Sequence, residues 1–500
     1  MPELKASQLL TSVAKTAATS VARSGTKHVT VAATAVGLAL AAVVVATTGP
    51  WDASGQRTAE ARRAAVRDAG GGADHGGAPG TRPGAPQAAP SAAAVLAAPG
   101  ASVPGPTRGA LAAVLDPLLK DPALGTHRTA AVVDAVTGKQ LYGRSAGDAL
   151  TPASTIKLAT AVAALTAAGP DHRIATRTAL DADAGRLVLV GGGDPTLTAR
   201  QKNPYGAASL RTLADKTAAS LKKSGHTEVT LGYDTSLYSG PATHPIGPNE
   251  NLAQVTALMV DEGRTDGSDS GPATRAVDPA AAAARTFADL LDERGIRTKG
   301  GAPAPGKAPG DAEAVAKVAS PPLSALVERM LTHSDNDIAE ALARQTAVAA
   351  DESHDFDGAG RAVRKQLATL RLPLTGTRFA DGSGLDRTDK ISADLLTKLL
   401  ATAAEPGRPG LRSVLTGLPV AGFTGTLSSR YEDAADASGI GLVRAKTGTL
   451  TGVNTLAGTV VDADGRLLVF AFMTQNAPGP QSAQAGLDRL ASTVADCGCH

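Results

Sequence analysis

One uncharged run near the start of the chain limits where a globular fold can begin. Val29–Thr48 carries no charge and is rich in Val and Ala, and about 20 such residues suffice to cross a ~30 Å hydrocarbon core. Four basic residues and one acidic residue precede it, so residues 1–28 are expected to stay in the cytoplasm while the rest is exported. Two interpretations are open: a signal anchor, which the length favours, or a signal peptide cut near Val44–Ala46.

The next segment, residues 49–107, is dominated by Gly, Ala and Pro. Such a composition buries too little apolar surface to offset the entropy of ordering, so it predicts a flexible linker. A folded unit is therefore expected from residue 108 onward.

Composition excludes several classes of function. The net charge of +2 and an aromatic content of 2% give no basic patch or stacking platform for nucleic acid. Cys497 and Cys499 are the only cysteines, too few for a disulfide framework, and no Cys/His spacing suggests a metal site. They could form a local bridge or remain a dithiol. We expect no metal and no cofactor.

Strand patterns occur at both ends of the folded unit, with helical patterns between them. Thr129–Val133 and Gln140–Gly143 predict a hairpin. The other predicted elements are a short strand at Leu187–Val190, helices at Pro152–Ala168, Pro322–Thr332, Asp337–Ala349 and Leu487–Ala495, and strands at Gly441–Ala445, Thr455–Val461 and Leu467–Thr474. This order predicts an α/β (α+β) fold, with an antiparallel sheet whose first and last strands pair and helices on both faces.

The first chemical motif is Ser154-Thr155-Ile156-Lys157 at the start of a predicted helix. Residues three apart share a helix face. A lysine that is partly desolvated loses its proton more easily and can serve as base for the serine hydroxyl. The helix N-terminus also offers free N–H groups for an oxyanion. Alone, the pattern is weak.

The second motif is Ser334-Asp335-Asn336, in the break between two predicted helices. A hydroxyl and a carboxamide there could face a cleft, the hydroxyl relaying a proton and the amide holding a carbonyl. Taken singly, helix capping is the better explanation, because Ser, Asp and Asn are favoured N-cap residues.

The third motif is Lys446-Thr447-Gly448-Thr449 at the end of a predicted strand. The glycine lets a substrate backbone approach the strand, while the lysine and the two threonines suit a carboxylate. A solvated lysine at a strand end is an equally good explanation of this segment alone.

The three motifs together, in this order, are the signature of class A β-lactamases and penicillin-binding proteins. Two further loops, Leu189–Leu197 and Asp381–Leu385, are more particular, and with them the chain from about Leu111 to Leu487 resembles the class C low-molecular-mass penicillin-binding proteins. These are D-alanyl-D-alanine carboxypeptidases/endopeptidases. The resemblance implies a penicillin-binding-protein/β-lactamase-like transpeptidase fold.

The resemblance also implies roles for individual residues. Ser154 would be the acylated nucleophile, Lys157 its base, Ser334 a proton relay, Asn336 a ligand of the substrate amide and Lys446 a positive charge. The substrate-binding residues would be Thr447, Gly448 and Thr449 beside the terminal carboxylate, and Arg387 and Leu450 beside the substrate side chain. The N–H groups of Ser154 and Thr449 would form the oxyanion hole. The partners implied are peptidoglycan stem peptides and β-lactam antibiotics, with the membrane reached through the N-terminal segment.

The chain departs from the family pattern between the first two motifs. Ser154 and Ser334 are 180 residues apart, and the family commonly inserts more. We therefore expect a peptidase domain of residues 108–175 and 280–500, with one smaller domain, residues 176–279, inserted into it. Residues 245–254 match the family's substrate pocket poorly, which leaves the pocket for the diamino acid open.

Two other functions compete with a D,D-peptidase. A class A β-lactamase needs a glutamate that activates the deacylating water, and the chain has none between Ser353 and Ala404. A catalytically idle sensor of β-lactam or peptidoglycan would have no need of the complete set of motif residues.

Overall fold

The computed structural model describes residues 105–498 apart from 204 and 434. The predicted cytoplasmic tail, the uncharged run and nearly all of the predicted linker lie outside these residues and stay predictions. Within the part of the chain that is described, no helix has both the length and the apolar character to cross a membrane.

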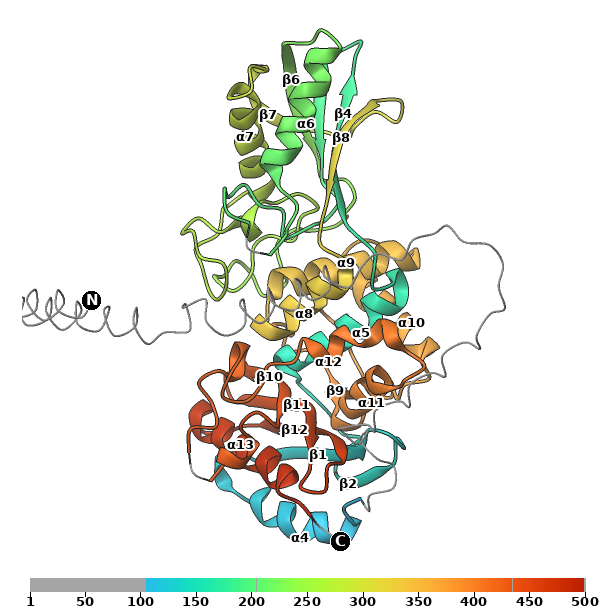
Figure 1. The fold of residues 1–500 in the computed structure, drawn as a ribbon, viewed down its shortest axis with the longest axis vertical. Coiled ribbons are helices and arrows are strands. Elements are labelled where there is room, and N and C mark those ends of the chain that lie inside the picture. The colour runs from blue at the N-terminus through green and yellow to red at the C-terminus, as the bar shows by residue number, and fades with distance from the viewer. Residues whose placement is uncertain (1–104, 204, 434, 499–500) are drawn as a thin grey trace, which may run out of the picture. The chain divides into compact units, whose positions relative to one another are not determined.

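The larger domain is built on a five-stranded antiparallel sheet with the order β10-β11-β12-β1-β2 (Figure 1). Its strands are β1 (His127–Asp134), β2 (Gln140–Arg144), β10 (Arg444–Leu450), β11 (Val453–Val461) and β12 (Leu467–Gln475). β1 pairs with β12, from His127 opposite Gln475 to Asp134 opposite Leu468. The predicted pairing of the first strand with the last is confirmed. The strand predicted from Gly441 begins later, at Arg444.

Side chains alternate across this sheet and bury both faces. In β1, Ala130 and Val132 pack with one set of helices, while Ala131 and Val133 pack with another, as the two-residue period of a strand requires. The first face is covered by α4 (Arg108–Leu118) and α13 (Pro480–Ala495). The second face is covered by α5 (Lys157–Ala168), α8 (Leu323–His333) and α11 (Ala393–Ala404). The helices predicted on both faces are therefore present.

Further helices complete this domain on the side of α5. They are η2 (Ala153–Ile156), a 3₁₀ turn, α9 (Asn336–Ala350), α10 (Phe356–Thr369) and the short α12 (Ser413–Thr416). A two-stranded sheet, β3 (Ala149–Leu150) with β9 (Ile391–Ser392), lies nearby. The helix predicted from Pro152 is thus divided, because its first turn is 3₁₀ and α5 starts only at Lys157.

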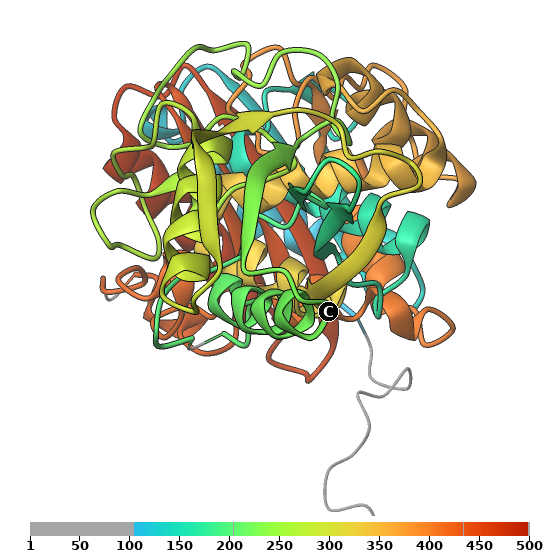
Figure 2. The ribbon, with the colours of Figure 1, turned by 90° about the horizontal axis from the view of Figure 1, so that it is seen from above.

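A second domain is inserted after α5 and faces the viewer in Figure 2. Its mixed sheet has the order β7-β6-β5-β4-β8. The strands are β4 (Ala175–Asp181), β5 (Arg186–Val190), β6 (Glu228–Asp234), β7 (Arg297–Pro305) and β8 (Glu313–Ala319), and the helices are α6 (Leu210–Lys223) and α7 (Pro279–Asp292). Both helices share one apolar core with the sheet.

The predicted boundary at residue 279 is wrong. α7, β7 and β8 belong to the second domain, which ends when β8 returns antiparallel beside β4, with Ala319 opposite Ala175. The error has a physical cause. β7 and β8 are the two edge strands of the sheet and are largely exposed, so neither has the apolar alternation by which strands are recognised.

Candidate active site

Ser154 lies in η2, where the chain turns into α5. Its side chain is partly exposed although its neighbours on both sides are buried. Ala153, just before it, has φ +47°, a left-handed conformation that costs a non-glycine residue free energy and is enriched at functional sites. The Thr155 hydroxyl donates to the Pro152 carbonyl at 2.8 Å, which holds this turn.

Lys157, one turn later, is fully buried. Its Nζ donates to Ser154 Oγ at 2.9 Å, to Asn336 Oδ1 at 2.7 Å and to the Ser383 carbonyl at 2.7 Å. The three acceptors use all three hydrogens of an ammonium group. Burial lowers the pKa of Lys157 to about 8, against the opposing effect of nearby carboxylates, of which Asp381 and Glu340 are the strongest. Lys157 is therefore placed to release a proton near the pH of the cell.

The Asp381–Gly384 loop supplies the Ser383 carbonyl. A side chain at Gly384, whose φ is +86°, would collide with the Ala153 carbonyl, and one at Gly382 would meet the Ala339 carbonyl. The two glycines thus allow the loop to lie between η2 and α9. The sequence suggested this loop only as a mark of the family, without a role in the chemistry.

The Ser334–Asn336 motif connects α8 to α9. The sequence left open whether it caps a helix or faces the active site, and in the structure it makes both kinds of contact. Asp335 is the N-cap and accepts from the Ile338 N–H at 2.9 Å. Ser334 has φ +58°, and its hydroxyl accepts from Lys446. Asn336 directs Oδ1 to Lys157, while its Nδ2 donates to the Asn251 carbonyl at 3.0 Å. Capping and the active-site contacts are therefore made by different residues of one motif.

Lys446 approaches from β10 and is also fully buried. Its Nζ donates to Ser334 Oγ at 2.8 Å and to the Thr447 carbonyl at 2.7 Å. Gly448 lets β10 lie against the turn that carries the serine, since a Cβ there would be 2.7 Å from the Pro152 carbonyl. All five residues predicted to act in catalysis are brought together by this packing.

The two lysines differ in their surroundings. Burial and the positive charge of Lys157 together hold the pKa of Lys446 well below its usual value. Several carboxylates around Lys157 favour its charged form, whereas the hydrogen-bond partners of Lys446 are a hydroxyl and a carbonyl.

Of the predicted substrate-binding residues, Thr447 and Thr449 lie on one face of β10, where Thr447 is half-buried and Thr449 is exposed. Thr447 Oγ1 donates to Thr426 Oγ1 at 2.8 Å, and Thr449 Oγ1 accepts from Gln484 at 3.2 Å. Arg387 is exposed, and its guanidinium donates to the Thr451 carbonyl at 3.0 Å. Arg387 therefore lies at the turn that directly follows Leu450.

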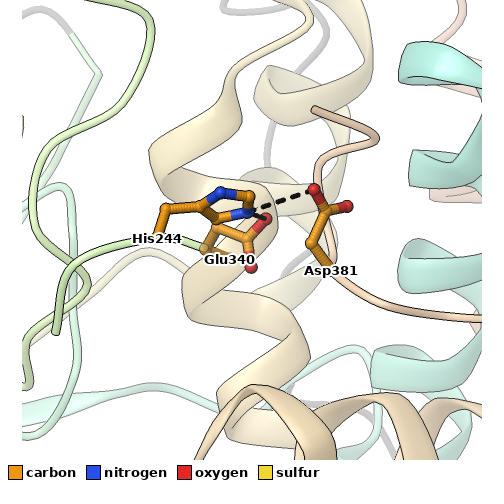
Figure 3. Close-up of side chains that lie close together, drawn as sticks. All are labelled: His244, Glu340 and Asp381. Atoms are coloured by element: carbon orange, nitrogen blue, oxygen red, sulfur yellow. Dashed lines mark hydrogen bonds and ion pairs between the residues drawn. The ribbon is translucent and has the colours of Figure 1, made fainter. Parts of the chain in front are cut away.

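A buried group of ionisable side chains behind the Asp381–Gly384 loop was not found from the sequence. It contains His244, Glu340 and Asp381 (Figure 3) and also Asp389. These residues come from the second domain, from α9 and from the loop itself, so no local spacing connects them. One signal was available in the sequence. Glu340 stands among the apolar residues of α9, and a charged residue in such a position is rarely buried without a partner.

Comparison with known proteins agrees with this geometry. The model of the D-Ala-D-Ala carboxypeptidase 3 (S13) family matches residues 111–273 and 265–494. The chain belongs to this family. A carboxypeptidase of Mycobacterium tuberculosis is 35% identical over 407 residues, which cover 79% of this chain and 85% of that protein. A D-alanyl-D-alanine carboxypeptidase of an Actinomadura species is 31% identical over 467 residues, covering 77% and 84%.

Among solved structures, penicillin binding protein 4 of Haemophilus influenzae has the same fold. It matches with a TM-score of 0.61 at 21% identity, over 76% of this chain and 97% of that protein. The family expected from the motifs and the transpeptidase fold are both confirmed. As a member of the S13 family, the chain is a serine-type hydrolase.

Proposed function

We propose that this S13 family member is a serine D,D-peptidase that hydrolyses the terminal D-Ala-D-Ala bond of peptidoglycan stem peptides and is acylated by penicillin at Ser154. The observation that carries the proposal is the hydrogen bond from Lys157 Nζ to Ser154 Oγ, in a site that also contains Lys446 and Ser334. The names of its relatives support the substrate class.

The proposed reaction follows from the positions of the hydrogen-bonding groups. Ser154 Oγ attacks the carbonyl carbon of the scissile bond while its proton passes to unprotonated Lys157 Nζ. The C–O bond forms, the C–N bond breaks, and the departing amine takes the proton that Lys157 accepted, relayed through Ser334 Oγ. A water molecule then gives a proton to Lys157 and attacks the ester carbonyl carbon. The bond to Ser154 Oγ breaks, the serine oxygen takes that proton back, and the carboxylic acid is released. Lys446, with Thr447 and Thr449, binds the terminal carboxylate, and this negative charge favours the protonated lysine.

A direct test combines two assays on the purified extracytoplasmic part. A fluorescent penicillin should label the protein covalently, and a tryptic peptide that contains Ser154 should carry the added mass. A peptide ending in D-Ala-D-Ala should release free D-alanine. Labelling with rapid recovery of the free enzyme would instead identify a β-lactamase, and labelling without peptide hydrolysis would identify a sensor.

The pKa of Lys157 gives this reaction a predicted pH dependence. The base must be unprotonated, so the acylation rate constant at saturating penicillin should rise about tenfold per pH unit below pH 8 and level off above it. Stopped-flow measurement between pH 6 and pH 10 checks this profile. A rate constant that does not change across this range would show that Lys157 is not the base.

We further propose that the peptidase domain acts outside the cytoplasm, held at the membrane by Val29–Thr48. The basic residues before this run support the orientation. Protease added to intact wall-less cells should digest the domain, whereas a cytoplasmic marker protein should survive. Protection of the domain would refute the orientation, and a mature product that starts near Thr47 would establish cleavage in place of anchoring.

A further inference from the structure

A loop of the second domain, residues 244–253, lies directly against the active-site region of the larger domain. It makes three hydrogen bonds to residues near Lys157. His244 Nε2 lies 3.1 Å from Asp381 Oδ2, the Asn251 carbonyl accepts from Asn336 Nδ2 at 3.0 Å, and the Ala253 N–H donates to Asp337 Oδ1 at 2.9 Å. The loop therefore contacts Asn336, which accepts from Lys157, and Asp381, which holds the Ser383 N–H.

One contact fixes the orientation of the Asn336 carboxamide. This group presents a donor and an acceptor that could exchange places by rotation. Because the Asn251 carbonyl accepts only from Nδ2, the oxygen Oδ1 is the atom that faces Lys157. The loop thus determines which end of the amide meets the base.

A second contact, between His244 and Asp381, links the loop to Lys157. The His244 ring is buried and packs edge-on against Phe356, with centroids 5.1 Å apart. The Ile246 N–H lies 3.3 Å from Nδ1, so in the neutral ring the proton is on Nε2, which donates to Asp381 (Figure 3). Glu340 Oε1 lies 3.8 Å from the same nitrogen.

Asp381 and Glu340 in turn hold the residue that contacts the base. The Ser383 N–H donates to Asp381 Oδ1 at 3.0 Å and to Glu340 Oε1 at 2.9 Å, and the Ser383 carbonyl accepts from Lys157. Burial and the neighbouring Asp381 raise the pKa of Asp389 well above its usual value. Asp386, two residues beyond this loop, also raises the pKa of His244.

We propose that the 244–253 loop positions the general base, with His244 as a positioning residue that acts through Asp381 and the Ser383 carbonyl. The inserted domain then completes the environment of Lys157, because its loop orients both acceptors of that lysine other than Ser154. This inference rests on the proposed role of Lys157 as the base.

The same three side chains could also be considered as metal ligands, since their ligand atoms lie within 4.8 Å of one another. The hydrogen bonds favour positioning instead. Asp381 accepts from three backbone N–H groups of its own loop, and Glu340 accepts from two. Oxygens that are occupied in this way are poor ligands for a cation.

Two amide substitutions separate a positioning role from a structural one. His244→Gln places its amide nitrogen near the position of Nε2 and keeps a donor for Asp381. His244→Asn has the shorter side chain and loses that donor, although it stays polar. His354→Asn is the matched control, because the His354 ring contacts the Leu237 carbonyl and, among the described residues, makes no hydrogen bond to Lys157, Asp381 or Glu340.

The readout is the second-order rate constant of acylation by penicillin from pH 6 to pH 10, with thermal unfolding measured in parallel. We expect His244→Asn to acylate about 10- to 100-fold more slowly, since small displacements of catalytic groups have effects of this size. The acid limb of its pH–rate profile should move to lower pH. A displaced Ser383 carbonyl no longer favours the charged form of Lys157, so the pKa of this lysine falls. His244→Gln should recover most of the rate, and His354→Asn should match the wild type.

Three outcomes would count against the inference. A His244→Asn enzyme with the wild-type rate constant and an unchanged acid limb, whatever its melting temperature, would reduce His244 to a structural role. Equal losses in the Gln and Asn variants would exclude the hydrogen bond as the cause. Loss of wild-type acylation on chelation, restored by zinc, would establish a metal site. A wild-type protein that penicillin never acylates would instead overturn the proposed function.

Discussion

Ser154→Ala is expected to abolish covalent labelling by penicillin and release of D-alanine while the protein stays folded. Among the described residues, Ser154 supplies the hydroxyl that is hydrogen-bonded to Lys157 Nζ, so the substitution removes the proposed nucleophile. The lost hydrogen bond should change the free energy of unfolding by only about 1–2 kcal/mol. Gel fluorescence of the labelled protein, D-alanine release and thermal unfolding measure the three quantities.

Ser413→Ala is a suitable control for this experiment. Ser413 is buried in α12, and its hydroxyl has no hydrogen-bond partner among the described residues, so its removal should cost little. The Ser413→Ala variant should be labelled by penicillin at the wild-type rate. Covalent labelling of Ser154→Ala at another residue would show that the nucleophile has been assigned wrongly.

Lys157→Arg is expected to abolish acylation, a loss beyond the ~10²–10⁴-fold typical of general-base catalysis, because base and nucleophile act as a unit. Arginine does not release a proton near neutral pH. Its planar guanidinium also differs in shape from the buried ammonium, whose three bonds run to Ser154, Asn336 and Ser383. The second-order rate constant of acylation across pH measures the effect.

Lys446→Arg is the matched comparison, a second buried lysine of the same site. Its partners are Ser334 Oγ and the Thr447 carbonyl, and its proposed role needs positive charge and no proton release. Acylation should persist with weaker substrate binding. Because an arginine at this position keeps its charge at every pH tested, it should also lower the pKa of Lys157. Equal losses in the two variants would refute this division of labour.

Much of the larger domain could be predicted from the sequence because its signals are local. The period-2 strands at both ends and the apolar helices between them led to a sheet whose first and last strands pair, and β1 does pair with β12. The second domain was harder to delimit, since its edge strands β7 and β8 are exposed and lack apolar alternation. A strand of this kind is defined by its neighbours in the sheet.

By itself, the sequence determined the three motifs, because each is a short run whose members the local backbone holds together. It could not determine which acceptors surround Lys157. Asn336, the Ser383 carbonyl and His244 are far from that lysine and from one another in the chain, and only the packing of η2, α9 and the inserted domain brings them within reach. The same packing lowers the pKa of both Lys157 and Lys446, because a pKa depends on burial and on the charges near the group in space.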